Sequence, residues 1–192
     1  SDNHNEAFYA ESEFFIDREN LEQKIEKIIT SLEKNTNEYI NIMKPLLKWI
    51  GGKQKLLHFI FDHIPKKINN YHELFLGGGS VLLELLEKQK ANEILIQKNI
   101  YAYDSNATLI AFHKQIQKDH DKLYREVLKL KNNWKNEETD EDKAAYYYKV
   151  RALYNSKEID IEKIAMFVFL NKTGFRGLFR LNKSGGFNVP YG

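Results

Sequence analysis

The sequence predicts an α/β fold organised around a single βαβ unit. Two short segments, residues 71–76 and 100–103, have the composition of strands, and residues 81–87 between them have that of a helix. A glycine turn, residues 77–80, separates the first strand from the helix, and an acidic residue, Asp104, follows the second strand. Strand, glycine turn, helix, strand and acid is the order found in nucleotide-binding βαβ units.

The composition is that of a globular protein and excludes several kinds of site. Of the 192 residues, 42% are hydrophobic and 29% are charged, a balance typical of neither disordered nor membrane proteins. The longest apolar run, residues 164–170, is too short to span a membrane, and no signal peptide is visible, so we expect an intracellular, cytoplasmic protein. The absence of cysteine excludes disulfides and thiol catalysis. His58, Asp62 and His63 share a predicted helix, but these residues do not provide three well-placed ligands, so no metal site is expected.

The N-terminal part is expected to be a helical extension. Apolar residues at positions 21, 25, 28, 29 and 32 form one helical stripe, which predicts an amphipathic helix packed on the core or on a partner. The composition changes near residue 43, and a lysine-rich stretch leads into a predicted helix over residues 56–64. We therefore expect three parts: an extension at 1–43, a core part at 44–118 and a third part at 119–192.

The third part is expected to follow a helix over residues 107–118. Residues 119–145 are highly charged, which indicates helical structure with an exposed loop. Asp160 is expected to cap a helix that is apolar almost all round as far as Leu170, and such a helix is typically buried. The remaining tail is rich in glycine and carries basic residues without a single acid.

The glycine turn and Asp104 are the first candidate site. Glycine allows a ligand to approach the backbone closely, and a carboxylate after the second strand can accept hydrogen bonds from ribose hydroxyls. A purely structural tight turn and a helix-capping role for Asp104 are the alternatives. Position 82 is leucine, so the third glycine of the dinucleotide fingerprint is missing. NAD and S-adenosylmethionine both present an adenosine ribose, and this pattern does not separate them.

A second candidate segment is Leu46-Leu47-Lys48-Trp49-Ile50-Gly51-Gly52-Lys53. Trp49 could be a core anchor among solvated lysines, which composition alone favours. Alternatively, the glycines could admit a ligand whose carboxylate meets Lys53. S-adenosylmethionine has such a carboxylate, whereas NAD has phosphates.

The tail interleaves basic, amide and aromatic residues, a pattern that suits nucleic acid. Lysine and arginine neutralise phosphates, asparagine and arginine contact base edges, and aromatic rings stack on unpaired bases. The alternative is a basic surface loop with packed phenylalanines.

Taken together, these segments resemble the Dam-type DNA adenine-N6 methyltransferases. The matching stretches are Leu47 to Lys53, Glu73 to Val81, Tyr103 to Asn106, and the tail from Phe169 to Gly192, in the order that the family has them. The resemblance implies a Rossmann-like S-adenosylmethionine-dependent methyltransferase fold. Residues 44–118 would be its cofactor-binding part, and residues 119–192 would be the helical start of a DNA-recognition region.

The resemblance also implies the ligands and their residues. S-adenosylmethionine would be the cofactor and double-stranded DNA the partner. The expected cofactor-binding residues are Trp49, Lys53, Phe75, Gly77, Gly79 and Asp104. The expected DNA-binding residues are Lys48, Asn171, Arg176, Asn182 and Lys183.

The chain departs from the family in one respect. The family places a catalytic Asp/Asn-Pro-Pro-Tyr/Phe motif after the recognition region, whereas the three prolines here, Pro45, Pro65 and Pro190, are all separate. We therefore expect no catalytic residue in this chain and an incomplete fold, completed by a downstream segment or a second polypeptide. A non-catalytic DNA- or partner-binding module is the alternative function. A nicotinamide-dependent oxidoreductase is disfavoured by the missing third glycine.

Overall fold

The computed structural model describes residues 13–15 and 47–192, in two compact units. Among the described residues, the first unit contains 13–15 and 51–110, and the second contains 47–50 and 111–192. The amphipathic helix expected over residues 20–32 lies outside the described residues. The expected division into 1–43, 44–118 and 119–192 stays a prediction.

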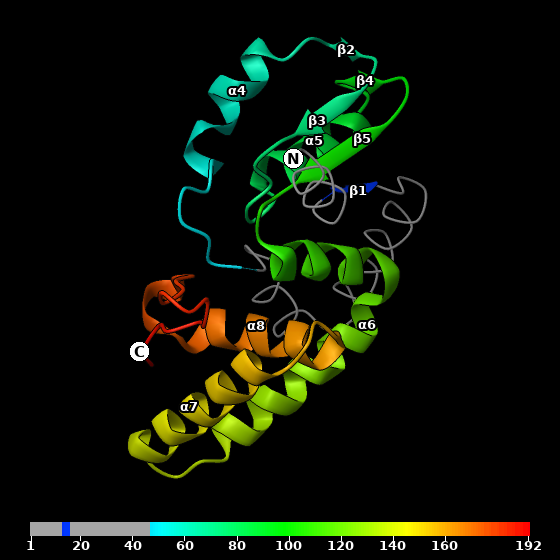
Figure 1. Cartoon of the computed structure of the whole chain (residues 1–192). Helices are drawn as coiled ribbons and strands as arrows, with labels where there is room; N and C mark the ends of the chain where they lie inside the picture. The colour runs from blue at the N-terminus through cyan, green and yellow to red at the C-terminus, as the bar shows by residue number, and fades with distance from the viewer. Residues whose placement is uncertain (1–12, 16–46) are drawn as a thin grey trace, which may run out of the picture. The chain divides into compact units, whose positions relative to one another are not determined.

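The first unit contains two small sheets. Strands β3 (Tyr71–Glu73) and β5 (Ile100–Tyr103) are parallel, and β1 (Glu13–Phe15) pairs antiparallel with β5 at the other edge (Figure 1). Strands β2 (Lys67–Ile68) and β4 (Leu95–Ile96) form a separate parallel pair. The mixed α/β fold is therefore confirmed, and β5 occupies the predicted residues.

The first predicted strand was too long. β3 ends at Glu73, and the chain then leaves the sheet, with Leu74 and Phe75 exposed. The Leu76 amide returns to donate to the Tyr103 carbonyl (2.8 Å). Apolar residues of a loop and of a strand are indistinguishable by composition when the segment is this short.

One face of the β3–β5 pair carries the core of the first unit. Helix α5 (Ser80–Lys90) contributes Leu82 and Leu85, and helix α4 (Leu57–His63), which follows a 3-10 turn η1 (Gln54–Leu56), contributes Phe61. Ile100 and Ala102 alternate with half-buried positions along β5 and complete this core, because successive strand residues face opposite sides of a sheet.

Helix α6 (Ala107–Lys135) runs from the end of the first unit into the second and is kinked at Asp119. Asp119 has non-helical torsions (φ −161°, ψ 88°), and its carboxylate accepts from the Lys122 amide (2.9 Å), so it caps a new helical segment. The predicted helix end at residue 118 is therefore a kink.

The second unit is mainly helical. Helices α7 (Asp140–Ser156) and α8 (Ile161–Thr173) pack on one another, and the exposed loop expected between residues 119 and 145 lies just before α7. Asp160 caps α8 as predicted, accepting from the Lys163 amide (2.8 Å). Every residue of α8 from Ile164 to Leu170 is buried, as its composition predicted.

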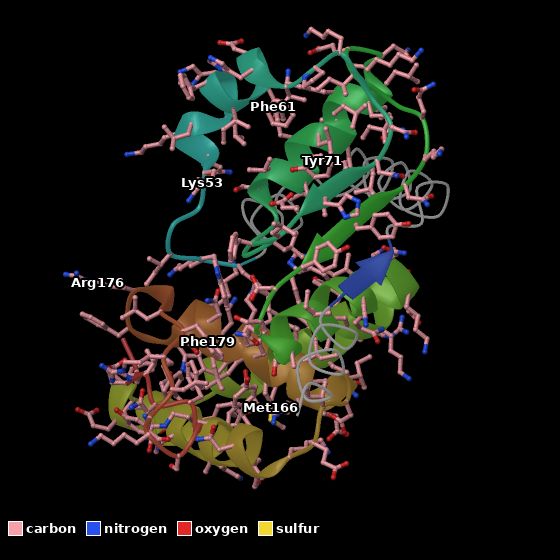
Figure 2. The ribbon with its side chains drawn as sticks, turned by 45° about the horizontal axis from the view of Figure 1, so that its top comes forward. Lys53, Phe61, Tyr71, Met166, Arg176 and Phe179 are labelled. Atoms are coloured by element: carbon pink, nitrogen blue, oxygen red, sulfur yellow. The ribbon has the colours of Figure 1, made fainter. Side chains whose placement is uncertain are left out.

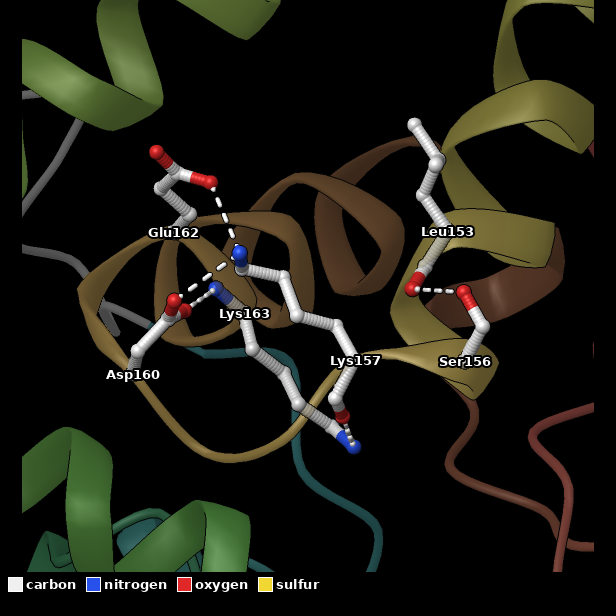
Figure 3. A network of polar contacts seen from close by, with 6 residues as sticks. All are labelled: Leu153, Ser156, Lys157, Asp160, Glu162 and Lys163. Carbon is white, nitrogen blue, oxygen red and sulfur yellow. Dashed lines mark hydrogen bonds and ion pairs between the residues drawn. The ribbon is translucent and has the colours of Figure 1, made fainter.

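The short connection between α7 and α8 is held by charges (Figure 3). The Lys157 ammonium contacts the carboxylates of Asp160 (2.9 Å) and Glu162 (3.0 Å), and the Lys163 side chain donates to the Lys157 carbonyl. These contacts join the connection to the first turn of α8.

After α8 the chain forms a 3-10 turn and a small hairpin. The turn η2 covers Phe175–Gly177, and isolated bridges join Gly174 to Tyr191 and Leu181 to Phe187. We call residues 180–188 the basic hairpin. None of the helices in the described part of the chain is long and apolar enough to cross a membrane.

Candidate functional site

The glycine turn of the first unit has a backbone that only glycine adopts easily. Gly77 and Gly79 have φ angles of 52° and 76°, in the left-handed region, and Gly79 is the residue that precedes α5. A side chain at either position would cost about 1–2 kcal/mol. The turn therefore presents bare backbone at the N-terminal end of a helix, where electron-rich groups are stabilised.

Asp104 joins this turn to the end of β5. One carboxylate oxygen accepts from the Gly77 amide (2.9 Å) and the other from the Asn106 amide (2.9 Å). The capping role that the sequence left open falls to Asn106, whose side-chain oxygen accepts from the Leu109 amide (3.0 Å) at the start of α6. The structure thus brings Asp104 and the glycine turn together, as expected for a nucleoside-binding βαβ unit.

Glu73 is a further site residue, which the sequence analysis missed. It ends β3, accepts from the Tyr71 hydroxyl (3.3 Å) and from the Leu82 amide in the first turn of α5, and is half-buried. Burial raises the pKa of Glu73 to about 7, although both hydrogen bonds oppose this shift. An acid between a predicted strand and a glycine turn was the signal that could have identified it.

The raised pKa makes stability depend on pH. The folded protein binds a proton at Glu73 that the unfolded chain releases above pH 4.5, so unfolding free energy is lost as pH rises through about 7. We expect Glu73→Gln to remove this pH-dependent decrease in the free energy of unfolding, which is on the order of 3 kcal/mol. Urea unfolding at several pH values between about pH 4.5 and 8 measures this. Glu87→Gln, at an exposed position of α5, is the control. Equal pH profiles for both variants would contradict the expectation.

Lys53 and Phe75 lie at the same turn. The Lys53 amide donates to the Ser80 hydroxyl oxygen (3.2 Å), and its ammonium donates to the Gly51 carbonyl (2.9 Å). Ser80 is the first residue of α5, directly after the turn. Phe75, 89% exposed, precedes the turn by two residues. The Lys53 backbone, the glycine turn and the Asp104 carboxylate thus meet at the start of α5, and Phe75 lies two residues before the turn.

Trp49, the remaining expected cofactor residue, belongs to the second unit. Its ring stacks on Phe179 (5.7 Å between centroids, 27° between planes) and meets Phe167 edge to face (6.1 Å). This is the core-anchor arrangement that composition favoured. A role for Trp49 in cofactor binding stays a prediction.

Among the expected DNA-binding residues, Asn171 is buried, with 3% of its surface exposed. Its side-chain oxygen accepts from the Lys48 amide (2.8 Å), and its side-chain nitrogen donates to the carbonyls of Lys48 (2.8 Å) and Gly177 (3.0 Å). These bonds give Asn171 a structural role, and a direct contact of its side chain with DNA stays a prediction. Asn171 holds the segment that carries Lys48 against the turn that carries Arg176.

Arg176 projects from the turn η2 into solvent (Figure 2). It has a φ of 54°, unusual for a residue other than glycine, and its guanidinium lies 5.1 Å from the centre of the Phe175 ring. Such strain at an exposed arginine is more common at binding sites than in neutral loops.

Lys183 and Asn182 lie at the tip of the basic hairpin. The Asn182 side-chain oxygen accepts from the amides of Ser184 (3.0 Å) and Gly186 (2.8 Å), which closes the tip. Lys183 is exposed beside it. Arg180, on the first arm, donates to the side-chain oxygen of Asn188 (2.8 Å) on the second. Lys183 thus fits a phosphate contact, whereas the Asn182 side chain organises the loop.

Lys48 and Lys172 lie close enough for their charges to interact. Burial, and then the neighbouring Lys48, lower the pKa of Lys172. Within the described residues, no group of three His, Asp or Glu side chains could hold a metal ion. Two neighbouring cations favour an anionic partner.

Comparison with known proteins identifies these segments. Residues 49–192 match the family described as D12 class N6 adenine-specific DNA methyltransferase. The type II methyltransferase M.MjaIII of Methanocaldococcus jannaschii is 39% identical over 158 residues, which are 78% of this chain and 52% of that protein. A DNA adenine methylase of Vibrio cholerae is 30% identical over 149 residues, 78% of this chain and 48% of its own. The chain therefore spans about half the length of the curated relatives it matches, and the resemblance noted in the sequence is confirmed.

Proposed function

Because the chain belongs to the D12 class of N6 adenine-specific DNA methyltransferases, we propose that it serves methyl transfer from S-adenosylmethionine to adenine in DNA. The observation that carries this proposal is the joining of Asp104 to the glycine turn by the Gly77 amide. In the proposed division of labour, the first unit binds the cofactor and the second contributes contacts to double-stranded DNA.

The residues around the glycine turn suit S-adenosylmethionine. A carboxylate offers about four acceptor positions, and Asp104 uses two of them on the Gly77 and Asn106 amides. The others are available to the ribose hydroxyls. Lys53 supplies a cation for the methionine carboxylate, and the backbone at Gly77 and Gly79 leaves room for the adenosine. The cofactor supplies an electrophilic methyl group.

Residues of the second unit suit the DNA backbone. Lys48, Arg176 and Lys183 are exposed cations on segments that side-chain or backbone hydrogen bonds hold in place. Phosphate contacts of this kind position a protein on the duplex without reading its sequence. The basic hairpin and the turn η2 are thus the proposed start of the DNA-recognition region.

The chemistry at adenine needs groups that these residues do not supply. The N6 lone pair is delocalised into the ring, so paired oxygen acceptors and a stacking aromatic ring are needed to hold the extruded base. The 192 residues contain no adjacent prolines and hence no Asp/Asn-Pro-Pro-Tyr/Phe motif. We therefore propose that a further segment or a second polypeptide brings the acceptors, and that the chain in hand contributes binding and orientation.

Calorimetry and a methylation assay test the proposal together. We expect saturable binding of S-adenosylmethionine and none of NAD, and transfer of labelled methyl to duplex DNA once a C-terminal half from a D12 relative is added. Retention of DNA without cofactor binding would instead indicate a non-catalytic DNA-binding module. Binding of NAD would indicate an oxidoreductase.

Arg176→Ala should weaken DNA binding in a salt-dependent way. Loss of one phosphate contact is expected to lower the slope of log affinity against log salt by about 0.9. Fluorescence anisotropy with a labelled duplex over a range of salt concentrations measures the slope. Arg125→Ala, an exposed arginine on α6, is the matched control and should leave it unchanged. The same slope in wild type and in Arg176→Ala would remove Arg176 from the proposed contacts.

A further inference from the structure

One face of helix α7 holds the returning arm of the basic hairpin. Tyr147, Arg151 and Asn155 are spaced by four residues, so they lie on the same side of the helix. All three direct their polar groups to backbone atoms between Phe187 and Val189. The side chains of α7 therefore bond the backbone of the extended segment 187–189, as a neighbouring strand would do in a sheet.

The Asn155 amide pairs with a single peptide unit in both directions. Its side-chain oxygen accepts from the Phe187 amide (2.8 Å), and its side-chain nitrogen donates to the Phe187 carbonyl (3.0 Å). The carbonyl of Val189 accepts from the Tyr147 hydroxyl (3.0 Å) and from the Arg151 guanidinium (2.9 Å). Such a ladder specifies the register of the arm, because a shift of one residue would break every one of these bonds.

The backbone pairing within the hairpin is sparse. Its arms are joined through the Leu181–Phe187 bridge, with backbone bonds from Asn182 to Gly186 and from Asn188 to Arg180. A two-stranded hairpin of this size is marginally stable in water. Beneath it the Phe187 ring packs against Tyr154 of α7 and against Phe179. The position of Arg180 and Lys183 thus depends on the helix that holds the second arm.

We infer that Asn155 is a positioning residue for DNA binding: it sets the place of Arg180 and Lys183 through the Phe187 backbone and touches no DNA itself. This inference rests on the proposed function, since it assumes that the hairpin meets DNA. Asn155 carries no charge, and that makes the inference testable. Losing a neutral contact to DNA lowers affinity without altering its salt dependence, whereas displacing two cations lowers both.

The test compares Asn155→Leu with Asn133→Leu, an exposed asparagine on α6 that receives the same chemical change. Affinity for a labelled DNA duplex of mixed sequence is measured over a range of salt concentrations. We expect Asn155→Leu to bind about tenfold more weakly and to lose about one unit of salt slope or more, and the control to match wild type. An unchanged slope in Asn155→Leu would overturn the inference.

Two further measurements separate positioning from misfolding and from failure of the proposed function. Hydrogen exchange of the Phe187 amide should accelerate in Asn155→Leu while the amides of α7 and α8 keep their protection. Lys183→Ala should weaken binding in wild type and add little in the Asn155→Leu background, because coupled residues are not additive. Additive effects would overturn the inference. Absence of DNA binding by the wild-type chain would instead count against the proposed function.

Discussion

Replacing Asp104 with alanine is expected to lower the affinity for S-adenosylmethionine by at least about tenfold. The change removes the acceptor proposed for the ribose hydroxyls, and hydrogen bonds to a charged group contribute about 1.5–3 kcal/mol. It also leaves the Gly77 and Asn106 amides without the carboxylate that now receives both. The glycine turn should therefore become less well ordered in the absence of ligand.

Titration calorimetry of the two variants Asp104→Ala and Asp104→Asn measures this effect. The asparagine keeps one acceptor oxygen and loses the charge, so we expect an affinity between those of wild type and the alanine variant. Asp121→Ala, an exposed aspartate on α6, is the control. Wild-type affinity in Asp104→Ala would show that the cofactor binds elsewhere.

Replacing Gly177 with alanine is expected to have the largest effect on stability. A Cβ at this position would lie 2.4 Å from Lys48 Cβ and 2.6 Å from Lys48 Cδ, and the backbone has a φ of 63°. The Gly177 carbonyl also accepts from buried Asn171, so the turn cannot move away without breaking that bond. Steric overlap and backbone strain together should cost about 3 kcal/mol or more.

Gly185 offers a matched comparison. It also has a positive φ, of 80°, but a Cβ there meets nothing within 4 Å. Gly185→Ala should therefore show only the backbone strain, about 1 kcal/mol. Thermal and urea unfolding of both variants separates the two terms. Equal destabilisation would mean that the contact between Gly177 and Lys48 does not constrain the fold.

The βαβ unit could be predicted because its signals are local. A glycine turn follows the first strand, an acid follows the second strand, and the helix between the two strands has an apolar stripe. The order of these signals along the chain was sufficient to predict the unit. The short strands β1, β2 and β4 could not be predicted, since segments of two or three residues have no measurable period. The continuation of α6 beyond residue 118 was missed for another reason, because a kink and a helix end look alike in sequence.

The site was predictable to the extent that backbone and charge define it. Gly77 and Asp104 meet as expected because parallel strands bring their carboxyl ends to the same edge. The burial of Asn171 could not be predicted, because an asparagine in a basic tail resembles an exposed DNA contact in sequence. Glu73 was missed because its raised pKa comes from burial between β3 and α5, which tertiary structure alone determines.

The most direct test of the central claim is a titration of the isotope-labelled protein with S-adenosylmethionine, followed by amide resonances. Binding at the proposed place should shift the amides of Gly77, Gly79 and Asn106 saturably, with smaller changes in α7. Saturable shifts confined to other residues, or no shifts at cofactor concentrations that saturate a D12 relative, would contradict the assignment of the glycine turn and Asp104 to the methyl donor.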